Sequence, residues 1–480
     1  MPEIAQGTDP LKLRDDFPPV PRDAWESAIR NDLKGADYEK KLVWRTGEGI
    51  SLQPYYRSED VAVLGSPVES APGEFPFLRG CGKPWEAAQD APTRPETIRG
   101  DFFHEAGATA VQELAYALAQ GVERVSELAE RNGSVDRAAR EIEFVFAAGS
   151  TFFPEIAKLR AARVLWASVI SAFGPTEESA SLMRIHVRTS RRNKSVYDRY
   201  TNLLRATTEA LAAVIGGCDR LTVVPFGFDE HLALNVQRIL AEESHLAVPA
   251  DPAGGSYFLE VVTDSLAREA WRLFQEVESA GGYTAALASG AIEKALARTR
   301  EDREKAVGLR RRTLVGVNNY PNLAEKSPEI DAPLAESQGH IREFRLAEPF
   351  EQIRERTARH SLAAGRYPRV LLLVRGDLKM RMARANFSLN FFGCAGFDIQ
   401  ASEEFEGKEA DLIVLCSSDP EYLNLAREVC PRAQVPVLVA GYPKDRIEAL
   451  QAAGIQGFIH LHSDAIRTLT EWQNRLGMKE

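Results

Sequence analysis

Short apolar runs alternate with helical stretches through the middle of this chain, and this alternation constrains the fold more than any other feature of the sequence. The runs that predict strands are 142–147, 184–188, 220–225 and 246–251. Apolar residues at helical spacing predict helices over 106–130, 153–172, 197–215, 229–243 and 263–279, the last capped by Thr263 or Asp264. Alternating strands and helices form parallel sheets. These four βα units are half of an eight-stranded barrel, which needs about 250 residues, so a partial or truncated (β/α) barrel is expected.

A second alternation lies near the carboxyl end of the chain. Its predicted strands are 370–374, 412–416, 437–440 and 458–460, and helices are expected from about Leu378, Pro420, Lys444 and Ser463. Strands and helices in this order with short loops are typical of a flavodoxin-like parallel sheet. The fold class is therefore α/β, with two parallel-sheet domains.

The segments that flank these domains complete the predicted organisation. Residues 1–80 are rich in Pro, Gly and charge, hold one predicted helix at 23–33, and are expected to form an extended arm. The barrel-like domain is expected at 81–304, a linker at 305–367 and the flavodoxin-like domain at 368–480. The linker holds a predicted helix from Pro349 to Ala358, and it either packs along a neighbouring domain or is a solvated spacer. A second linker or long loop is expected at 82–100, which contains three prolines. An incomplete barrel has sheet edges that proteins rarely expose, so the arm, a linker or a partner chain is expected to cover them.

Composition excludes several classes of function. The formal net charge of -10 argues against nucleic-acid binding, and no apolar run approaches the roughly 18 residues of a membrane span. Residues 1–17 lack the features of a signal peptide, so a cytoplasmic location is expected. Five scattered cysteines indicate reduced thiols: Cys81, Cys218, Cys394, Cys416 and Cys430. The pair His460 and His462 is better interpreted as strand-end polar residues than as a metal site.

Six segments, in one order along the chain, resemble the methylmalonyl-CoA mutase family. They are PGEFPFLRG (72–80), FHEAGATAVQELAYAL (103–118), FFPEIAKLRAARVLWA (152–167), RTS (188–190), ADPAGGSYFLEVVTDSLAREAW (250–271) and VGVNNYPN (315–322). The resemblance extends from about residue 16 to about residue 470. It implies a barrel domain that binds an acyl-CoA thioester and a C-terminal domain that binds adenosylcobalamin. Many bacterial members pair a catalytic large subunit with a related small subunit that lacks the cofactor.

The run after the strand 370–374 departs from the family pattern at its chemical positions. The family motif is Asp-x-His-x-x-Gly, whose histidine ligates cobalt, whereas this chain reads Asp377-Leu-Lys379-Met-Arg-Met382. A lysine is protonated near neutral pH and has no lone pair to give a metal. Met382 replaces the glycine, and its helical spacing from Leu378 predicts a side chain that points to the sheet and fills the space of the cofactor's nucleotide tail. Asp377 is expected to cap the helix.

The other cobalamin contacts of the family are also altered. The resemblance matches the serine of its second loop to Ser417 or Ser418, and its third-loop Gly-Gly to Ala440-Gly441. An added methyl group obstructs backbone that must touch a ligand. Basic residues near the helix start attract anions, but without a glycine-rich loop a solvated basic face is the preferred interpretation: Lys379, Arg381 and Arg384. No cofactor is expected in this chain, and adenosylcobalamin is expected in a partner large subunit.

The thioester half shows similar losses. Where the family has Gly-Tyr-His, with a histidine that hydrogen-bonds the substrate, this chain has Gly100-Asp101-Phe102. Phenylalanine cannot donate a hydrogen bond, although His104, two positions on, is a conceivable shifted replacement. After Arg79-Gly80 a tyrosine-bearing segment is missing, and with it the first strands of the family barrel. The run Arg188-Thr189-Ser190 keeps two of three family residues, so it forms with Arg79 either a residual CoA-binding site or only a strand-end turn and cap.

These departures favour a non-catalytic small subunit of a heterodimeric methylmalonyl-CoA mutase. Its expected partner is the catalytic large subunit, which the N-terminal arm helps to embrace in this family, and acyl-CoA is a further candidate ligand. No catalytic residue and no metal site are assigned to this chain. Two alternatives stay open: a free-standing binding or scaffold protein that has left the mutase pathway, and a competent acyl-CoA mutase.

Overall fold

The computed structural model describes residues 19–65, 68–88, 96–325, 328, 330, 335–405 and 409–478. The first 18 residues of the predicted arm, including the segment considered for a signal peptide, lie outside the described residues. Contacts along the chain divide it into two units, Met1–Arg57 and Ser58–Glu480. No helix in the described part of the chain is long and apolar enough to cross a membrane.

The first unit is small and has little interior. It contains α1 (Arg22–Asp32), α2 (Tyr38–Lys41) and the antiparallel pair β1 (Trp44–Arg45) and β2 (Ser51–Leu52). Helix α1 has no buried residue, and the side chains of Trp25 and Trp44 are 47% and 50% exposed. An aromatic contact between Trp25 and Tyr55, with ring centroids 5.6 Å apart, is one of its internal contacts.

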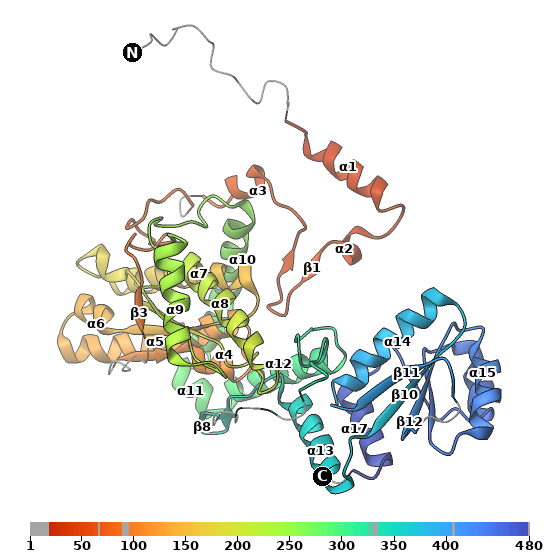
Figure 1. The fold of residues 1–480 in the computed structure, drawn as a ribbon. Coiled ribbons are helices and arrows are strands. Elements are labelled where there is room, and N and C mark those ends of the chain that lie inside the picture. The colour runs from red at the N-terminus through yellow and green to blue at the C-terminus, as the bar shows by residue number, and fades with distance from the viewer. Residues whose placement is uncertain are drawn as a thin grey trace, which may run out of the picture. The chain divides into compact units, whose positions relative to one another are not determined.

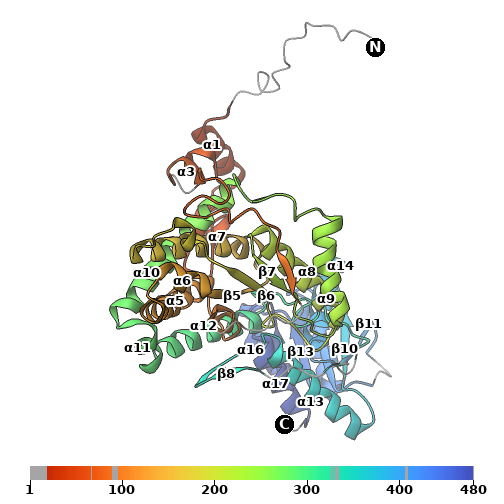
Figure 2. The same ribbon diagram turned by 90° about the vertical axis from the view of Figure 1, so that its left-hand side faces the viewer.

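The second unit contains a five-stranded parallel sheet in the order β3-β7-β6-β5-β4 (Figures 1 and 2). Its strands are β3 (Glu86–Ala88), β4 (Thr97–Arg99), β5 (Glu143–Ala148), β6 (Ile185–Thr189) and β7 (Arg220–Thr222). Every pair in the sheet is parallel. The first strand in the sequence, β3, pairs with the last, β7, and only eight residues separate it from β4 at the opposite edge.

Helices accompany these strands along the chain, with α3 before the first strand and the others after β4. They are α3 (Ser58–Ala62), α4 (Gly100–Glu105), α5 (Ala110–Asn132), α6 (Val135–Glu141), α7 (Phe152–Phe173), α8 (Arg199–Ile215), α9 (Glu230–Arg238), α10 (Tyr257–Ser279), α11 (Gly282–Ala288) and α12 (Ala291–Gly308), with a π-helical turn at Ile239–Glu243. Phe144 of β5 packs edge-on against Trp166 of α7, with ring centroids 4.7 Å apart. A Cβ on Gly121 of α5 would lie 2.8 Å from the Phe144 ring, so this glycine permits close approach of helix and strand. Side chains alternate along a strand, and the opposite face therefore carries Glu143, Val145 and Ala147.

Three details of the first sheet differ from the prediction. The segment 82–100 is more than a linker, because it contributes the edge strands β3 and β4, and β4 covers the edge of β5. The predicted strand 246–251 is wrong: these residues form turns, Val248 is 81% exposed, and Pro249 has no amide hydrogen for a ladder. Helix α10 begins at Tyr257 with Ser256 as its N-cap, so the predicted caps at Thr263 or Asp264 are wrong.

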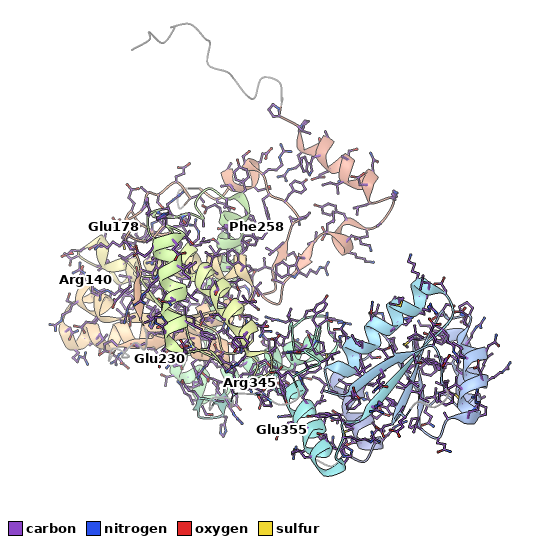
Figure 3. The ribbon with its side chains drawn as sticks, in the orientation of Figure 1. Arg140, Glu178, Glu230, Phe258, Arg345 and Glu355 are labelled. Atoms are coloured by element: carbon purple, nitrogen blue, oxygen red, sulfur yellow. The ribbon has the colours of Figure 1, made fainter. Side chains whose placement is uncertain are left out.

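The segment 305–367 packs against the carboxyl-terminal sheet, which decides between the two alternatives for this predicted linker. It contains the hairpin β8 (Ser337–Gln338) and β9 (Ile341–Arg342) and helix α13 (Glu348–Ala364). Leu314, Phe344 and Phe350 are buried in one apolar cluster with Val370 and Leu372. Arg345, labelled in Figure 3, forms two hydrogen bonds of 2.6 Å to Glu351 at the start of α13.

The second sheet is also parallel and five-stranded, in the order β11-β10-β12-β13-β14. Its strands are β10 (Arg369–Val374), β11 (Asp398–Ser402), β12 (Leu412–Cys416), β13 (Val437–Ala440) and β14 (Gly457–Ile459), and its helices are α14 (Leu378–Gly393), α15 (Tyr422–Val429), α16 (Ile447–Ala452) and α17 (Ala465–Arg475). Numbered along the chain this order is 2-1-3-4-5, the order of flavodoxin-like sheets. The sequence did not indicate β11, a half-exposed edge strand.

Candidate functional site

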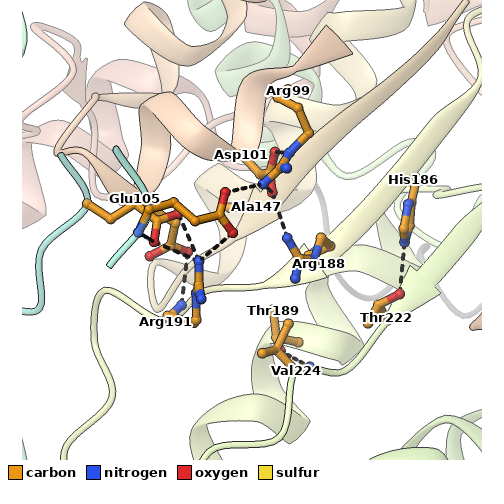
Figure 4. A network of polar contacts seen from close by, with 12 residues as sticks. Arg99, Asp101, Glu105, Ala147, His186, Arg188, Thr189, Arg191, Thr222 and Val224 are labelled. Carbon is orange, nitrogen blue, oxygen red and sulfur yellow. Dashed lines mark hydrogen bonds and ion pairs between the residues drawn. The ribbon is translucent and has the colours of Figure 1, made fainter. Parts of the chain in front are cut away.

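Polar residues gather where β4 and β6 end, the edge at which parallel α/β sheets place their ligands (Figure 4). Arg99, the last residue of β4, forms a two-pronged ion pair with Asp101 of α4, at 2.6 and 2.9 Å. Arg188 of β6 donates to the same carboxylate at 3.2 Å. Asp101 is buried and both arginines are about one quarter exposed. One carboxylate thus balances two guanidinium groups at this edge.

A segment from much later in the chain supplies further carboxylates to this edge. We refer to residues 335–346, which include β8 and β9, as the strap. Arg191, just past β6, donates to both oxygens of Glu343 at 2.8 and 2.6 Å and to Glu336 at 3.2 Å, and Arg99 reaches Glu336 at 3.4 Å. Burial raises the pKa of Glu343, against the opposing effect of Arg191. Two backbone bonds fix the strap: Phe344 N–H donates to the Glu105 carbonyl and Leu346 N–H to the Arg192 carbonyl.

A buried network lies behind this edge. His104 Nε2 is 3.0 Å from Ser190 Oγ, and His104 Nδ1 is 3.3 Å from Glu113 Oε2. Lys158 Nζ donates to Glu113 at 2.8 Å and to the Ala147 carbonyl at 2.6 Å. Burial and the nearby cations lower the pKa of His104 well below its usual value, so the imidazole is neutral.

The order serine–histidine–carboxylate is that of an acyl-transfer triad. However, Ser190 and His104 are 1% and 2% exposed, so a substrate carbonyl has no access to the hydroxyl in this structure. The network links α4, α5 and α7 to the end of β6, so its contribution is to the stability of the fold. His104 is turned into this network and away from solvent.

The predicted CoA-binding residues do not form one site. Thr189 Oγ1 accepts from Val224 N–H at 2.8 Å, and Ser190 Oγ accepts from Arg192 N–H at 3.1 Å. Arg79 donates to the Val68 carbonyl at 2.7 Å and lies 3.6 Å from Asp251, within a different group of loops. Phe102 is 1% exposed and has joined the core.

The ends of the second sheet present the residues matched to the cobalamin motif. Asp377 accepts a hydrogen bond from Met380 N–H at 2.9 Å, which confirms it as the N-cap of α14. Lys379 is exposed. The prediction for Met382 is wrong: its side chain is 48% exposed and does not fill a space against the sheet, because α14 buries none of its residues before Ala385.

The side chain of Glu421 lies against this loop. The carboxylate of Glu421 accepts from Ser417 Oγ at 2.6 Å, from Ser418 Oγ at 2.5 Å and from Asp377 N–H at 3.3 Å. The two serine hydroxyls lower the pKa of Glu421 to about 2, so it is ionised at neutral pH. A Cβ on Gly376 would overlap this carboxylate.

The residues at this edge do not fit a cobalt ligand set. The side chain at the position matched to the family histidine, Lys379, is an ammonium group. His460 and His462 lie past β14, three strands away from β10 in the sheet. The His460 ring packs against Tyr442, with centroids 4.7 Å apart. Ala440 is buried, and a Cβ on Gly441 would lie 3.3 Å from Tyr422. Nor do the described residues contain a group of three or more His, Cys, Asp or Glu side chains suited to a metal ion.

Comparison with known proteins gives the family. The model of the family described as methylmalonyl-CoA mutase matches residues 84–364, more than half of the chain. The chain belongs to the methylmalonyl-CoA mutase family. It is 31% identical to the methylmalonyl-CoA mutase small subunit of Porphyromonas gingivalis, over 98% of this chain and 99% of that protein. It is 36% identical to the small subunit of Streptomyces virginiae, over 80% of this chain but 65% of that protein. It is 40% identical to the methylmalonyl-CoA mutase of Cereibacter sphaeroides over 240 residues, about half of this chain and a third of that one.

The alignment with the P. gingivalis protein also shows how many positions are missing from this chain. It extends over 619 positions, whereas this chain has 480 residues, so at least 139 positions have no counterpart here (619 minus 480). The sequence alone had indicated a deletion after Arg79-Gly80.

Several residues of the two edges were missed at the level of sequence. Arg99, Arg191, Glu336, Glu343 and Glu421 belong to no motif. Arg99 and Arg191 are next to the runs 100–102 and 188–190, but nothing in the sequence marks them as polar partners of one another. Their partners are up to 237 residues away, as for Arg99 and Glu336. Only the fold brings them together.

Proposed function

We propose that this chain is a non-catalytic small subunit of a heterodimeric adenosylcobalamin-dependent methylmalonyl-CoA mutase. It stabilises or assembles a large subunit that carries the cofactor and isomerises the acyl-CoA. The observation that carries the proposal is the loop after β10, where the resemblance calls for an imidazole and this chain has the exposed ammonium of Lys379. The ionised Glu421 supports it, because it accepts hydrogen bonds from Ser417 and Ser418, the residues matched to the family's cofactor-contacting serine, and places a negative charge beside that loop.

The first sheet supports the same proposal. We infer that it is a (β/α) barrel that lacks three of eight strands between β3 and β4. The pairing of the first strand with the last is the closing pair of a barrel, and a βα unit of such a barrel takes about 30 residues. The 139 missing positions are sufficient for three units. A barrel with this gap cannot surround a thioester, so catalysis is assigned to the partner.

An absorption titration with adenosylcobalamin tests this function. We expect no spectral change with this chain alone, and the change of bound cofactor when the large subunit is present. The large subunit alone is the control. Stoichiometric binding by this chain together with isomerisation of methylmalonyl-CoA in the absence of a partner would show that it is a competent mutase.

The missing segment also favours a second candidate, a free-standing scaffold protein, because an interface with a large subunit could require the absent strands. Size-exclusion chromatography of a mixture with the large subunit separates the two. Co-elution supports the small-subunit function, and separate elution supports the free-standing protein.

A further inference from the structure

The first sheet ends in more positive charge than its own residues balance. Arg99, Arg188 and Arg191 lie within reach of one another through shared partners. The sheet layer contributes two carboxylates to these three cations: Asp101, which bonds Arg99 and Arg188, and Glu105, which accepts from the Arg191 amide. Neighbouring guanidinium groups repel unless an anion lies between them. Arginine is also the side chain best suited to bind the paired oxygens of phosphates and carboxylates.

The strap completes the balance with Glu336 and Glu343. The Glu343 carboxylate accepts two hydrogen bonds from one guanidinium nitrogen of Arg191, and Glu336 spans Arg191 and Arg99 at 3.2 and 3.4 Å. The strap therefore places oxyanions where a bound oxyanion would lie.

The carboxyl end of the strap is firmly held. Phe344 and Leu346 are 4% and 1% exposed and belong to the apolar cluster of the second sheet. Residues 336–340 are exposed. The Glu336 side chain is 43% exposed, and its ion pairs to Arg99 and Arg191, at 3.4 and 3.2 Å, are longer than the 2.6 Å pair between Glu343 and Arg191. Exposed ion pairs of this length contribute little to stability, about 0 to 1 kcal/mol each. The tip of the strap can therefore leave the arginines while its anchor stays in place.

We propose that Arg99, Arg188 and Arg191 form a latent anion-binding site, which the strap closes with its own carboxylates. The ligand class is a small oxyanion with at least two acidic groups, either a diphosphate or a dicarboxylate. Binding exchanges the Glu336 and Glu343 oxygens for those of the ligand and frees the tip of the strap. The site is independent of cobalamin and of a large subunit, so its test does not depend on the proposed function.

The experiment measures binding to the full-length chain by isothermal titration calorimetry, with inorganic pyrophosphate in one arm and malonate in the other. The variant Glu336→Gln with Glu343→Gln keeps the shape of the strap and removes its charge. We expect it to bind at least one probe about tenfold more tightly than the unmodified chain, because the internal competitor is weakened. The arm with the tighter binding identifies the chemistry.

Two further variants make the result specific. Glu293→Gln with Glu301→Gln, on the exposed face of α12, changes the net charge equally and is expected to leave binding unchanged. Adding Arg191→Ala to the strap variant is expected to remove the gain. If the strap variant does not fold by circular dichroism, Glu336→Gln alone serves, since this residue is exposed, with an expected gain of about threefold. No gain for either probe over the α12 control would overturn the proposal.

Discussion

At the scale of single residues, His186 on β6 is a buried imidazole among cations. Its Nε2 lies 2.9 Å from Thr222 Oγ1, and burial, with Arg220 and Arg188 nearby, lowers the pKa of His186 to about 4. The unfolded chain binds a proton at this position below about pH 6.5, while the folded chain stays neutral until about pH 4. Stability is therefore lost as the pH falls through this window.

The variant His186→Asn tests this linkage. Between pH 7 and pH 5 the unmodified chain is expected to lose about 2 kcal/mol more unfolding free energy than the variant. The measurement is urea denaturation at several pH values in one buffer system. Parallel curves for the two proteins would show that His186 does not titrate in this range.

Other residues show how far sequence reasoning extends at this scale. Asp377 was correctly predicted as the N-cap of α14, because a cap is a local feature of the sequence. The prediction for Met382 was wrong, since helical spacing assigned it to a buried stripe although the burial of α14 begins only at Ala385. Glu421 was missed because its hydroxyl partners acquire meaning only when two loops meet.

At the scale of elements, α14 depends on its cap. Asp377 satisfies the amide of Met380 at the helix start, and the helix buries Phe391 and Phe392 against the second sheet. Asp377→Ala is expected to lower the unfolding free energy of this sheet by about 1 kcal/mol, whereas Asp377→Asn, also a good cap, is expected to change it by less. Chemical denaturation followed by circular dichroism measures both. Equal losses in the two variants would assign the effect to charge and not to capping.

Elements with strong internal patterns were predictable, and those made by neighbours were not. Strand β5 and helices α5 and α7 carry long apolar patterns, which the sequence shows directly. Strands β3 (Glu-Ala-Ala) and β4 (Thr-Ile-Arg) are only three residues each, in a segment rich in proline. The sequence of β3 has little β propensity, and β4 is too short for its Thr and Ile to form a recognisable pattern. They form strands because their backbones pair with those of β7 and β5, respectively. This is a tertiary effect that overrides local preference.

At the scale of the whole molecule, the chain divides into two units by their internal contacts. Residues 1–57 form the smaller unit, and residues 58–480 form the larger unit, which contains both five-stranded sheets. The smaller unit exposes two tryptophans, Trp25 and Trp44, and α1 buries none of its residues. Exposed tryptophans are costly for a unit that stays alone and are common energetic centres of protein interfaces. This composition fits the arm of the proposed small subunit.

The last prediction concerns that arm. A chain without residues 1–57 is expected to retain its circular dichroism and a thermal midpoint within about 2 °C, because the second unit keeps both of its sheets. It is expected to lose co-elution with the large subunit on size exclusion. In the full-length chain, Trp25→Ala with Trp44→Ala is expected to weaken association by at least about tenfold. The control Leu362→Ala, at an apolar residue of α13 that is 85% exposed, is expected to have no effect. If the shortened chain still co-elutes with the large subunit, the interface lies on the second unit, and the incomplete barrel becomes the surface that the partner covers.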